Sequence, residues 1–123
     1  MQETFNISVI LPIFNGEKFI KKCLDALLIQ KNIKNCEIIF VDDASTDNSI
    51  NIINSYNLKN VKIFSLSQNS GPAVARNLGL KNSIGDYIYF CDVDDLIDAD
   101  ALTILYEAAI NYNCEYVFSD FKK

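Results

Sequence analysis

The segment Tyr87–Asp95 reads YIYFCDVDD, an apolar, strand-forming run that ends in three carboxylates. Such a run is typical of a strand buried in a parallel sheet. The acids that end it repel one another, because two unit charges about 4 Å apart cost about 4 kcal/mol at an effective dielectric near 20. Folding must therefore raise a pKa, spread the side chains, or recruit a hard cation such as Mg²⁺ or Mn²⁺. We expect the cation.

Asp92 and Asp94 should point to the same side, because side-chain direction alternates along an extended segment. Both carboxylates can then reach one metal ion, or one can bind a metal and the other a ribose hydroxyl. The alternative is a solvated turn between strand and helix, in which Asp95 or Asp98 caps the next helix.

The composition indicates one domain with an acidic surface. Half of the 123 residues are hydrophobic, enough for one sizeable core. The formal net charge of −5 argues against a nucleic-acid partner, although a metal ion or helix N-termini can still attract an anionic ligand locally. The absence of histidine excludes a histidine base and a histidine-containing zinc site.

The cysteines and the apolar runs indicate a cytoplasmic location. Cys23, Cys36, Cys91 and Cys114 show no paired short spacing, so we expect them to be reduced and buried. No apolar stretch reaches the ~18 residues of a membrane span, and the first residues lack the basic start of a signal peptide. A full-length protein could still lie at the inner face of the membrane.

Strand-forming runs alternate with helical patterns along the chain. Strands are expected at residues 7–11, 37–41, 61–66, 86–91 and 116–118, and helices at 17–30, 47–56, 73–83 and 98–111. This alternation predicts a single α/β domain over residues 1–123, with a Rossmann-like, mainly parallel sheet and helices on both faces. We expect Tyr87, Tyr89 and Phe90 to belong to its core.

The polar residues that interrupt this pattern fall at the carboxyl ends of the expected strands, where open parallel sheets bind ligands. They are Asn15, Glu17, Asp42, Asp43, residues 69–77 and residues 92–95. Asp42 or Asp43 could accept the imide N–H of a uracil ring, or the pair could cap the turn that follows. For Glu17 we expect an exposed helix pair with Lys21 rather than catalysis.

The segment Asn69–Gly79, NSGPAVARNLG, opens a helix with a cation one turn inside. Gly71 allows close backbone approach, and the free N–H groups of the first turn suit a phosphate. Arg76 could meet that phosphate or form a structural ion pair with Asp42 or Asp43.

In this order, four motifs resemble the N-terminal half of a family 2 inverting nucleotide-sugar glycosyltransferase with the GT-A fold. The matching stretches are Ser8–Glu17 (SVILPIFNGE), Ile39–Ser49 (IFVDDASTDNS), Asn69–Gly79 and Gly85–Asp95 (GDYIYFCDVDD). The resemblance covers nearly the whole chain, but it says almost nothing about which sugar is transferred.

The resemblance implies inverting transfer of a sugar from a nucleoside diphosphate, expected to be UDP, to a saccharide or lipid-linked acceptor in cell-surface polysaccharide synthesis. Asp94, with Asp92, would hold Mn²⁺ or Mg²⁺, and Asp43 would contact the base. Phe14 stands where tyrosine is usual, and Ala44 where glycine is common. The implied nucleotide-binding residues are Pro12, Phe14, Asn15, Glu17, Asp42, Asp43, Gly71, Arg76, Asp92 and Val93.

The family's catalytic base would lie beyond Lys123, so we expect a truncated donor-binding half that binds nucleotide weakly and turns over poorly. Three alternatives remain. A receiver domain would need acids after the first strand and a phosphorylatable aspartate after the third, where the chain has PIFN and SLS. An aspartate-nucleophile phosphatase expects D-x-D on its first strand. The third alternative is a non-catalytic nucleotide-sugar-binding module.

Overall fold

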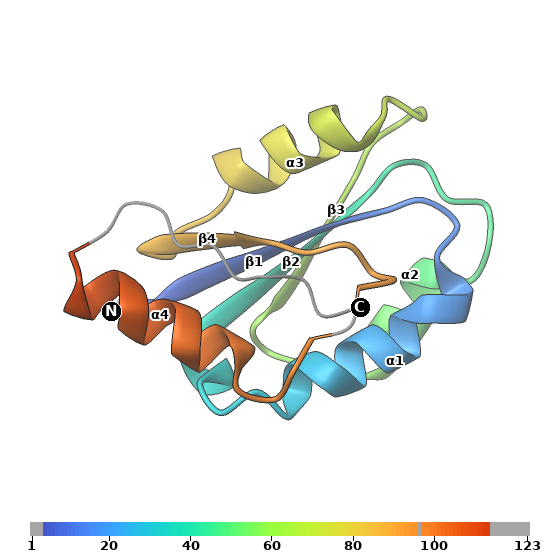
Figure 1. Cartoon of the computed structure of the whole chain (residues 1–123). Coiled ribbons are helices and arrows are strands. Elements are labelled where there is room, and N and C mark those ends of the chain that lie inside the picture. Colours follow the sequence, from blue (N-terminus) through green and yellow to red (C-terminus); the bar gives the residue numbers. More distant parts are fainter. Residues whose placement is uncertain (1–3, 96, 114–123) are drawn as a thin grey trace.

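The computed structural model describes residues 4–95 and 97–113. Strands and helices alternate in it as the sequence predicts (Figure 1). Its elements are β1 (Ile7–Ile13), α1 (Glu17–Leu28), the short 3-10 helix η1 (Ile33–Asn35), β2 (Cys36–Asp42), α2 (Ser49–Ser55), β3 (Val61–Ser65), α3 (Pro72–Lys81), β4 (Tyr87–Phe90) and α4 (Ala101–Asn111).

The four strands form one parallel sheet in the order β3-β2-β1-β4. α3 lies on one face of this sheet, and α1, α2 and α4 lie on the other (Figure 1). The predicted α/β class, with a parallel sheet and helices on both faces, is confirmed.

β1 sits inside the sheet and pairs on both sides. It pairs with β2 from Ile7↔Cys36 to Ile13↔Asp42, and with β4 over its first residues. The sheet grows from β1 through β2 to β3 on one side and adds β4 on the other, so the strand order reverses at β1. Because parallel strands end at the same edge, the loops after β1, β2 and β4 meet there.

Two cores hold the layers together. The larger lies between the sheet and the helices α1, α2 and α4, and includes Leu11, Leu24, Phe40 and Leu102. The smaller lies under α3. Gly79 allows α3 to approach the sheet, because a Cβ there would come 2.6 Å from Ile10 Cγ2.

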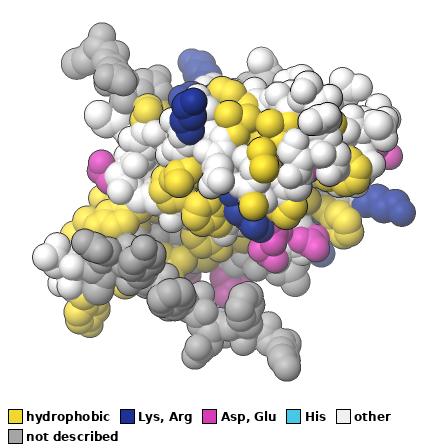
Figure 2. Space-filling view, turned by 90° about the horizontal axis from the view of Figure 1, so that it is seen from above, with side chains coloured by type: hydrophobic (Ala, Val, Ile, Leu, Met, Phe, Trp, Pro, Cys, Tyr) yellow, Lys and Arg dark blue, Asp and Glu magenta, His cyan; other side chains and the backbone are white. Residues whose placement is uncertain are grey.

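The face that α3 covers carries exposed hydrophobic side chains among polar ones (Figure 2). Val74 and Leu80 of α3 are exposed, and so is Ile84 in the segment that follows. The helix therefore buries only a narrow stripe, in agreement with a small core beneath it.

Some element boundaries differ from the prediction. α2 begins at Ser49 rather than at residue 47, and α4 begins at Ala101 rather than at residue 98, because the preceding acids lie in turns. The residue before α2 is Asn48. The predicted strand at residues 116–118 lies outside the described residues.

The prediction for Phe90 is wrong. Tyr87 and Tyr89 pack against the larger core, and the ring of Tyr87 meets that of Tyr106 edge to face. Phe90 belongs to the alternate side of β4 and is 50% exposed.

The predicted state of the cysteines is confirmed where the structure describes it. Cys23, Cys36 and Cys91 are free and buried, and Cys114 lies outside the described residues. Burial raises the pKa of the Cys36 thiol to about 11, so it is unreactive at neutral pH. None of the helices in the described part of the chain combines the length and hydrophobicity that crossing a bilayer requires.

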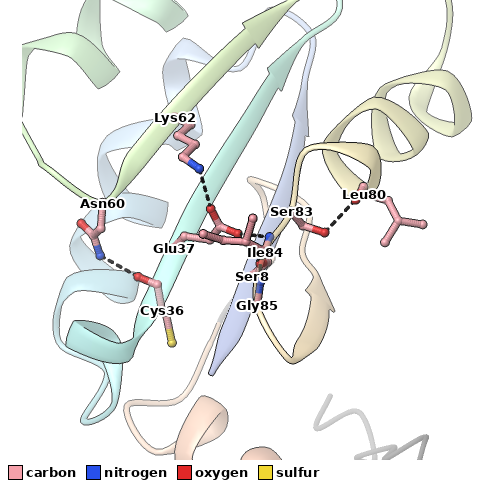
Figure 3. A network of polar contacts seen from close by, with 9 residues as sticks. All are labelled: Ser8, Cys36, Glu37, Asn60, Lys62, Leu80, Ser83, Ile84 and Gly85. Atoms are coloured by element: carbon pink, nitrogen blue, oxygen red, sulfur yellow. Dashed lines mark hydrogen bonds and ion pairs between the residues drawn. The ribbon is translucent and has the colours of Figure 1, made fainter. Parts of the chain in front are cut away.

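A buried carboxylate, that of Glu37, joins the strands near their amino ends, at the edge of the sheet opposite to the loops after β1, β2 and β4 (Figure 3). Glu37 Oε2 accepts hydrogen bonds from Ser8 Oγ at 2.5 Å and from Ile84 N at 2.6 Å, and Oε1 pairs with Lys62 Nζ at 3.1 Å. Ser8 Oγ in turn accepts the N–H of Gly85. One charge thus connects β1, β2, β3 and the turn that leads into β4.

We predict that Glu37→Gln lowers the free energy of unfolding by about 2 kcal/mol or more, because an amide group would face donors that need an acceptor. Urea unfolding at neutral pH measures this difference. Glu107→Gln, at an exposed position of α4, is the control and should change stability by less than about 0.5 kcal/mol.

The destabilisation should also depend on pH. Burial raises the pKa of Glu37, but the Ile84 N–H, the Ser8 hydroxyl and Lys62 together outweigh it, so the pKa lies below its ordinary value of 4.5. The carboxylate therefore stabilises the fold above that value, and the stabilisation is lost as pH falls through the lower, folded-state pKa. The gap between wild type and Glu37→Gln should shrink in acid; a constant gap would contradict the role of the charge.

Candidate functional site

A pocket of about 330 Å³ lies at the carboxyl ends of the central strands. Its volume falls in the range typical of small-molecule sites. The acids after β2 and β4 share this pocket, as the sequence predicts. Its lining comes from the end of β1 and the loop after it, the residue after β2, the turn after β4, and the first turns of α1 and α3: Pro12, Ile13, Phe14, Asn15, Gly16, Phe19, Asp43, Pro72, Asp92, Val93 and Asp94.

The loop between β1 and α1 forms an apolar wall of the pocket. Phe14 and Phe19 both line it and are 53% and 48% exposed, so two aromatic rings are available to a ligand. Gly16 lets this loop approach the turn after β4, because a Cβ there would come 3.2 Å from Val93 Cγ2. The wall is therefore packed against the turn after β4, called the acidic turn below because it contains Asp92, Asp94 and Asp95.

Asp43 joins the end of β2 to the start of α3. Its Oδ1 accepts the N–H of Ser70 at 2.6 Å and its Oδ2 accepts that of Gly71 at 2.9 Å. Gly71 has a left-handed backbone (φ 94°), which glycine adopts without strain. Asp42 is also buried, but its Oδ1 accepts the N–H of Ser45 and it does not line the pocket.

The residues after β4 form a turn and are not extended. The N–H of Asp95 bonds to the carbonyl of Asp92 at 3.0 Å, and Asp95 Oδ2 accepts the N–H of Asp92 at 3.0 Å. Strand alternation was therefore the wrong reason for expecting Asp92 and Asp94 to converge. The turn brings one carboxylate oxygen each of Asp92, Asp94 and Asp95 within 4.8 Å of one another.

This acidic turn meets the chemical requirement for a hard divalent cation. It offers exposed carboxylate oxygens, the ligands that Mg²⁺ and Mn²⁺ prefer. Asp92 pairs with Arg76 at 3.1 Å, and Asp95 holds a backbone N–H. Within the described residues, Asp94 is the member of the cluster whose carboxylate takes no hydrogen bond or ion pair.

Four of the predicted nucleotide-binding residues do not line the pocket: Glu17, Asp42, Gly71 and Arg76. Arg76 pairs with Asp92, so the alternative that it forms an ion pair with Asp42 or Asp43 is wrong. The expected helix pair of Glu17 with Lys21 is also wrong. Glu17 Oε2 accepts the N–H of Asn48, and Lys21 pairs with Asp25.

Sequence reasoning missed four residues that line the pocket: Ile13, Gly16, Phe19 and Pro72. Ile13 and Phe19 carry no polar signal, and Phe19 fits the apolar pattern of α1, so nothing in the sequence separates it from the core. Gly16 and Pro72 lie inside motifs that the sequence does single out, and their position there was the available signal.

Comparison with known proteins shows the family to which the chain belongs. Residues 8–123 match the model of the family described as glycosyl transferase family 2. Glycosyltransferase GlyA of Streptococcus pneumoniae serotype 4 is 37% identical over 94% of this chain, and the poly(ribitol-phosphate) beta-glucosyltransferase of Bacillus spizizenii is 45% identical over 78%. The chain spans 16% of the length of each of these two relatives.

The crystal structure of residues 1–349 of S. aureus TarS superimposes with a TM-score of 0.84 and 35% identity, over 89% of this chain and 33% of that one. The receiver-domain and phosphatase alternatives are therefore wrong. The chain belongs to glycosyl transferase family 2 and has the GT-A fold.

Proposed function

We propose that this chain is the donor-binding part of an inverting glycosyltransferase that takes a UDP-sugar together with Mn²⁺ or Mg²⁺. The observation that carries the proposal is the shared pocket, in which Asp43 after β2 and Asp92 and Asp94 after β4 lie against the β1–α1 loop. TarS has been crystallised with UDP and with UDP-GlcNAc, which favours a uridine donor for its relative here.

In this proposal Asp43 contacts the base. Each of its oxygens already accepts one backbone N–H, and an ionised carboxylate has about four lone-pair sites, so it can accept the imide N–H of uracil as well. Pro12, Phe14 and Asn15 provide the wall beside it. Phe14 has no hydroxyl, so it contributes an apolar ring surface alone.

The diphosphate would lie between the acidic turn and the start of α3. Asp94, supported by Asp92, would hold the divalent cation, which offsets the negative charge that develops on the leaving diphosphate. The space beside Gly71, at the start of α3, is open, since a Cβ there would meet nothing within 4 Å. Arg76 lies one turn inside α3, and its ion pair with Asp92 connects that helix to the acidic turn.

The reaction itself would be direct attack of an acceptor hydroxyl on the anomeric carbon, with inversion and departure of the nucleoside diphosphate. Residues of this chain orient the donor; we assign the role of acceptor base to none of the carboxylates in the described ranges. The beta-glucosyltransferase relative acts on poly(ribitol-phosphate), which favours a saccharide or polyol acceptor in surface-polymer synthesis. We expect the chain alone to bind nucleotide and to transfer sugar poorly.

We predict that UDP with Mn²⁺ raises the melting temperature of this chain. At a UDP concentration near 100 times Kd the expected stabilisation is about 2.7 kcal/mol. Differential scanning fluorimetry measures it, with GDP, ADP and inorganic phosphate as controls. A shift of equal size with phosphate, or none with UDP, would reject the proposed donor.

We predict that Asp94→Asn removes the Mn²⁺-dependent part of that stabilisation and leaves metal-independent UDP binding, because the substitution removes a charge from the acidic turn without changing its shape. Calorimetric titration with UDP, with and without MnCl₂, separates the two parts. Asp98→Asn, at an exposed acid outside the pocket, is the matched control. Full Mn²⁺ dependence in Asp94→Asn would mean that the metal binds elsewhere.

A further inference from the structure

Two acids, Glu17 and Asp47, join the residues at which α1 and α2 begin. The N–H of Glu17, the first residue of α1, donates to Asp47 Oδ2 at 3.1 Å. In return the N–H of Asn48, the residue before α2, donates to Glu17 Oε2 at 3.1 Å. Neither helix has a side-chain cap from its own N-cap residue, Gly16 or Asn48. The start of α1 therefore depends on a carboxylate of the β2–α2 loop. The N–H of Ser49, the first residue of α2, donates to Asp47 Oδ1 of its own loop at 3.0 Å, and Glu17 adds the acceptor for the N–H of Asn48.

Further hydrogen bonds extend this exchange along both loops. The N–H of Gly16 donates to Ser49 Oγ at 3.0 Å, and that hydroxyl donates to Asp47 Oδ1 at 2.5 Å. The N–H of Asn15 donates to Ser45 Oγ, and Asn15 Oδ1 accepts the N–H of Thr46. The three consecutive N–H groups of residues 15–17 thus donate to side chains of the segment 45–49.

Asp47 is the centre of this network. Burial raises its pKa, but the Ser49 hydroxyl and the N–H groups of Ser49 and Glu17 outweigh burial, so its pKa lies below its ordinary value. The carboxylate is thus ionised at neutral pH and uses both oxygens as acceptors.

The two loops that these acids join also form the pocket. The β1–α1 loop supplies Phe14, Asn15 and Gly16 to its lining, and the β2–α2 loop begins at Asp43. Both loops contain a non-glycine residue with a left-handed backbone, Asn15 (φ 50°) and Ala44 (φ 63°). Such conformations persist only where surrounding contacts hold them.

We propose that Glu17 and Asp47 are positioning residues, which lock the β1–α1 loop to the β2–α2 loop and so fix the apolar wall of the pocket relative to Asp43. Neither side chain lines the pocket. The locking itself is independent of the proposed function; its effect on nucleotide affinity rests on that function.

The locking can be tested without ligand by amide hydrogen exchange. Asp47→Asn loses one acceptor, since its amide group would face an N–H, and exchange should rise about fivefold at both loops, residues 15–17 and 48–49, as for the loss of a cap. Asp25→Asn is the control: this acid also joins the two helices, through Tyr56, but at their other ends. Faster exchange at residues 48–49 alone would overturn the proposal.

The consequence for the ligand is tested by the Kd for UDP with MnCl₂. Glu17→Ala should raise Kd about fivefold, whereas Glu17→Gln, whose amide oxygen can still accept the N–H of Asn48, should stay close to wild type, as should Asp25→Asn. Equal losses in Glu17→Gln and Glu17→Ala would mean that the charge of Glu17 acts on the ligand directly, and an unchanged Glu17→Ala would remove the positioning role. Failure of wild type to bind UDP would reject the proposed function, while the exchange experiment would still decide the locking.

Discussion

Parallel pairing of β1 with β2 on one side and β4 on the other is the constraint on which the rest of this structure depends. It places the ends of these strands at one edge, so the loops that follow them have to share the same space. All residues of β2 are buried and nearly all of β1, because helices cover both faces of the sheet. The pocket is the space between the ends of the strands and the starts of the helices.

The loops at this edge contain more backbone N–H groups than the sheet can satisfy, and carboxylates take up many of them. Asp42, Asp43 and Asp47 each accept at least one such group, and so do Glu17 and Asp95. Within the described residues, Asp94 accepts none and lies exposed in the acidic cluster. The acids of this edge thus divide into those that build the loops and those left for a ligand.

The charged groups at the two ends of the strands are arranged in opposite ways. At the amino ends of β1 and β2, Glu37 is fully buried, and hydrogen-bond donors and Lys62 surround it (Figure 3). At the carboxyl ends, Asp92, Asp94 and Asp95 are exposed and close together, with Arg76 on one of them. Charge is fully paired where it joins strands, and left in excess where the pocket opens.

Hydrophobic periodicity determined the order of strands and helices, and the motifs at the strand ends determined which edge carries the site, because both are local properties of the chain. Only the tertiary structure decided the partner of each acid: Arg76 meets Asp92, Glu17 meets the start of α2, and Glu37 proves to be buried. The tertiary structure also places Phe19 in the lining of the pocket, although the apolar pattern of α1 would assign it to the core. The physical reason is that the sequence shows where a carboxylate stands in the chain, but not whether it caps a loop, joins strands or faces a ligand. Its role follows from which donors the fold brings within about 3 Å of it.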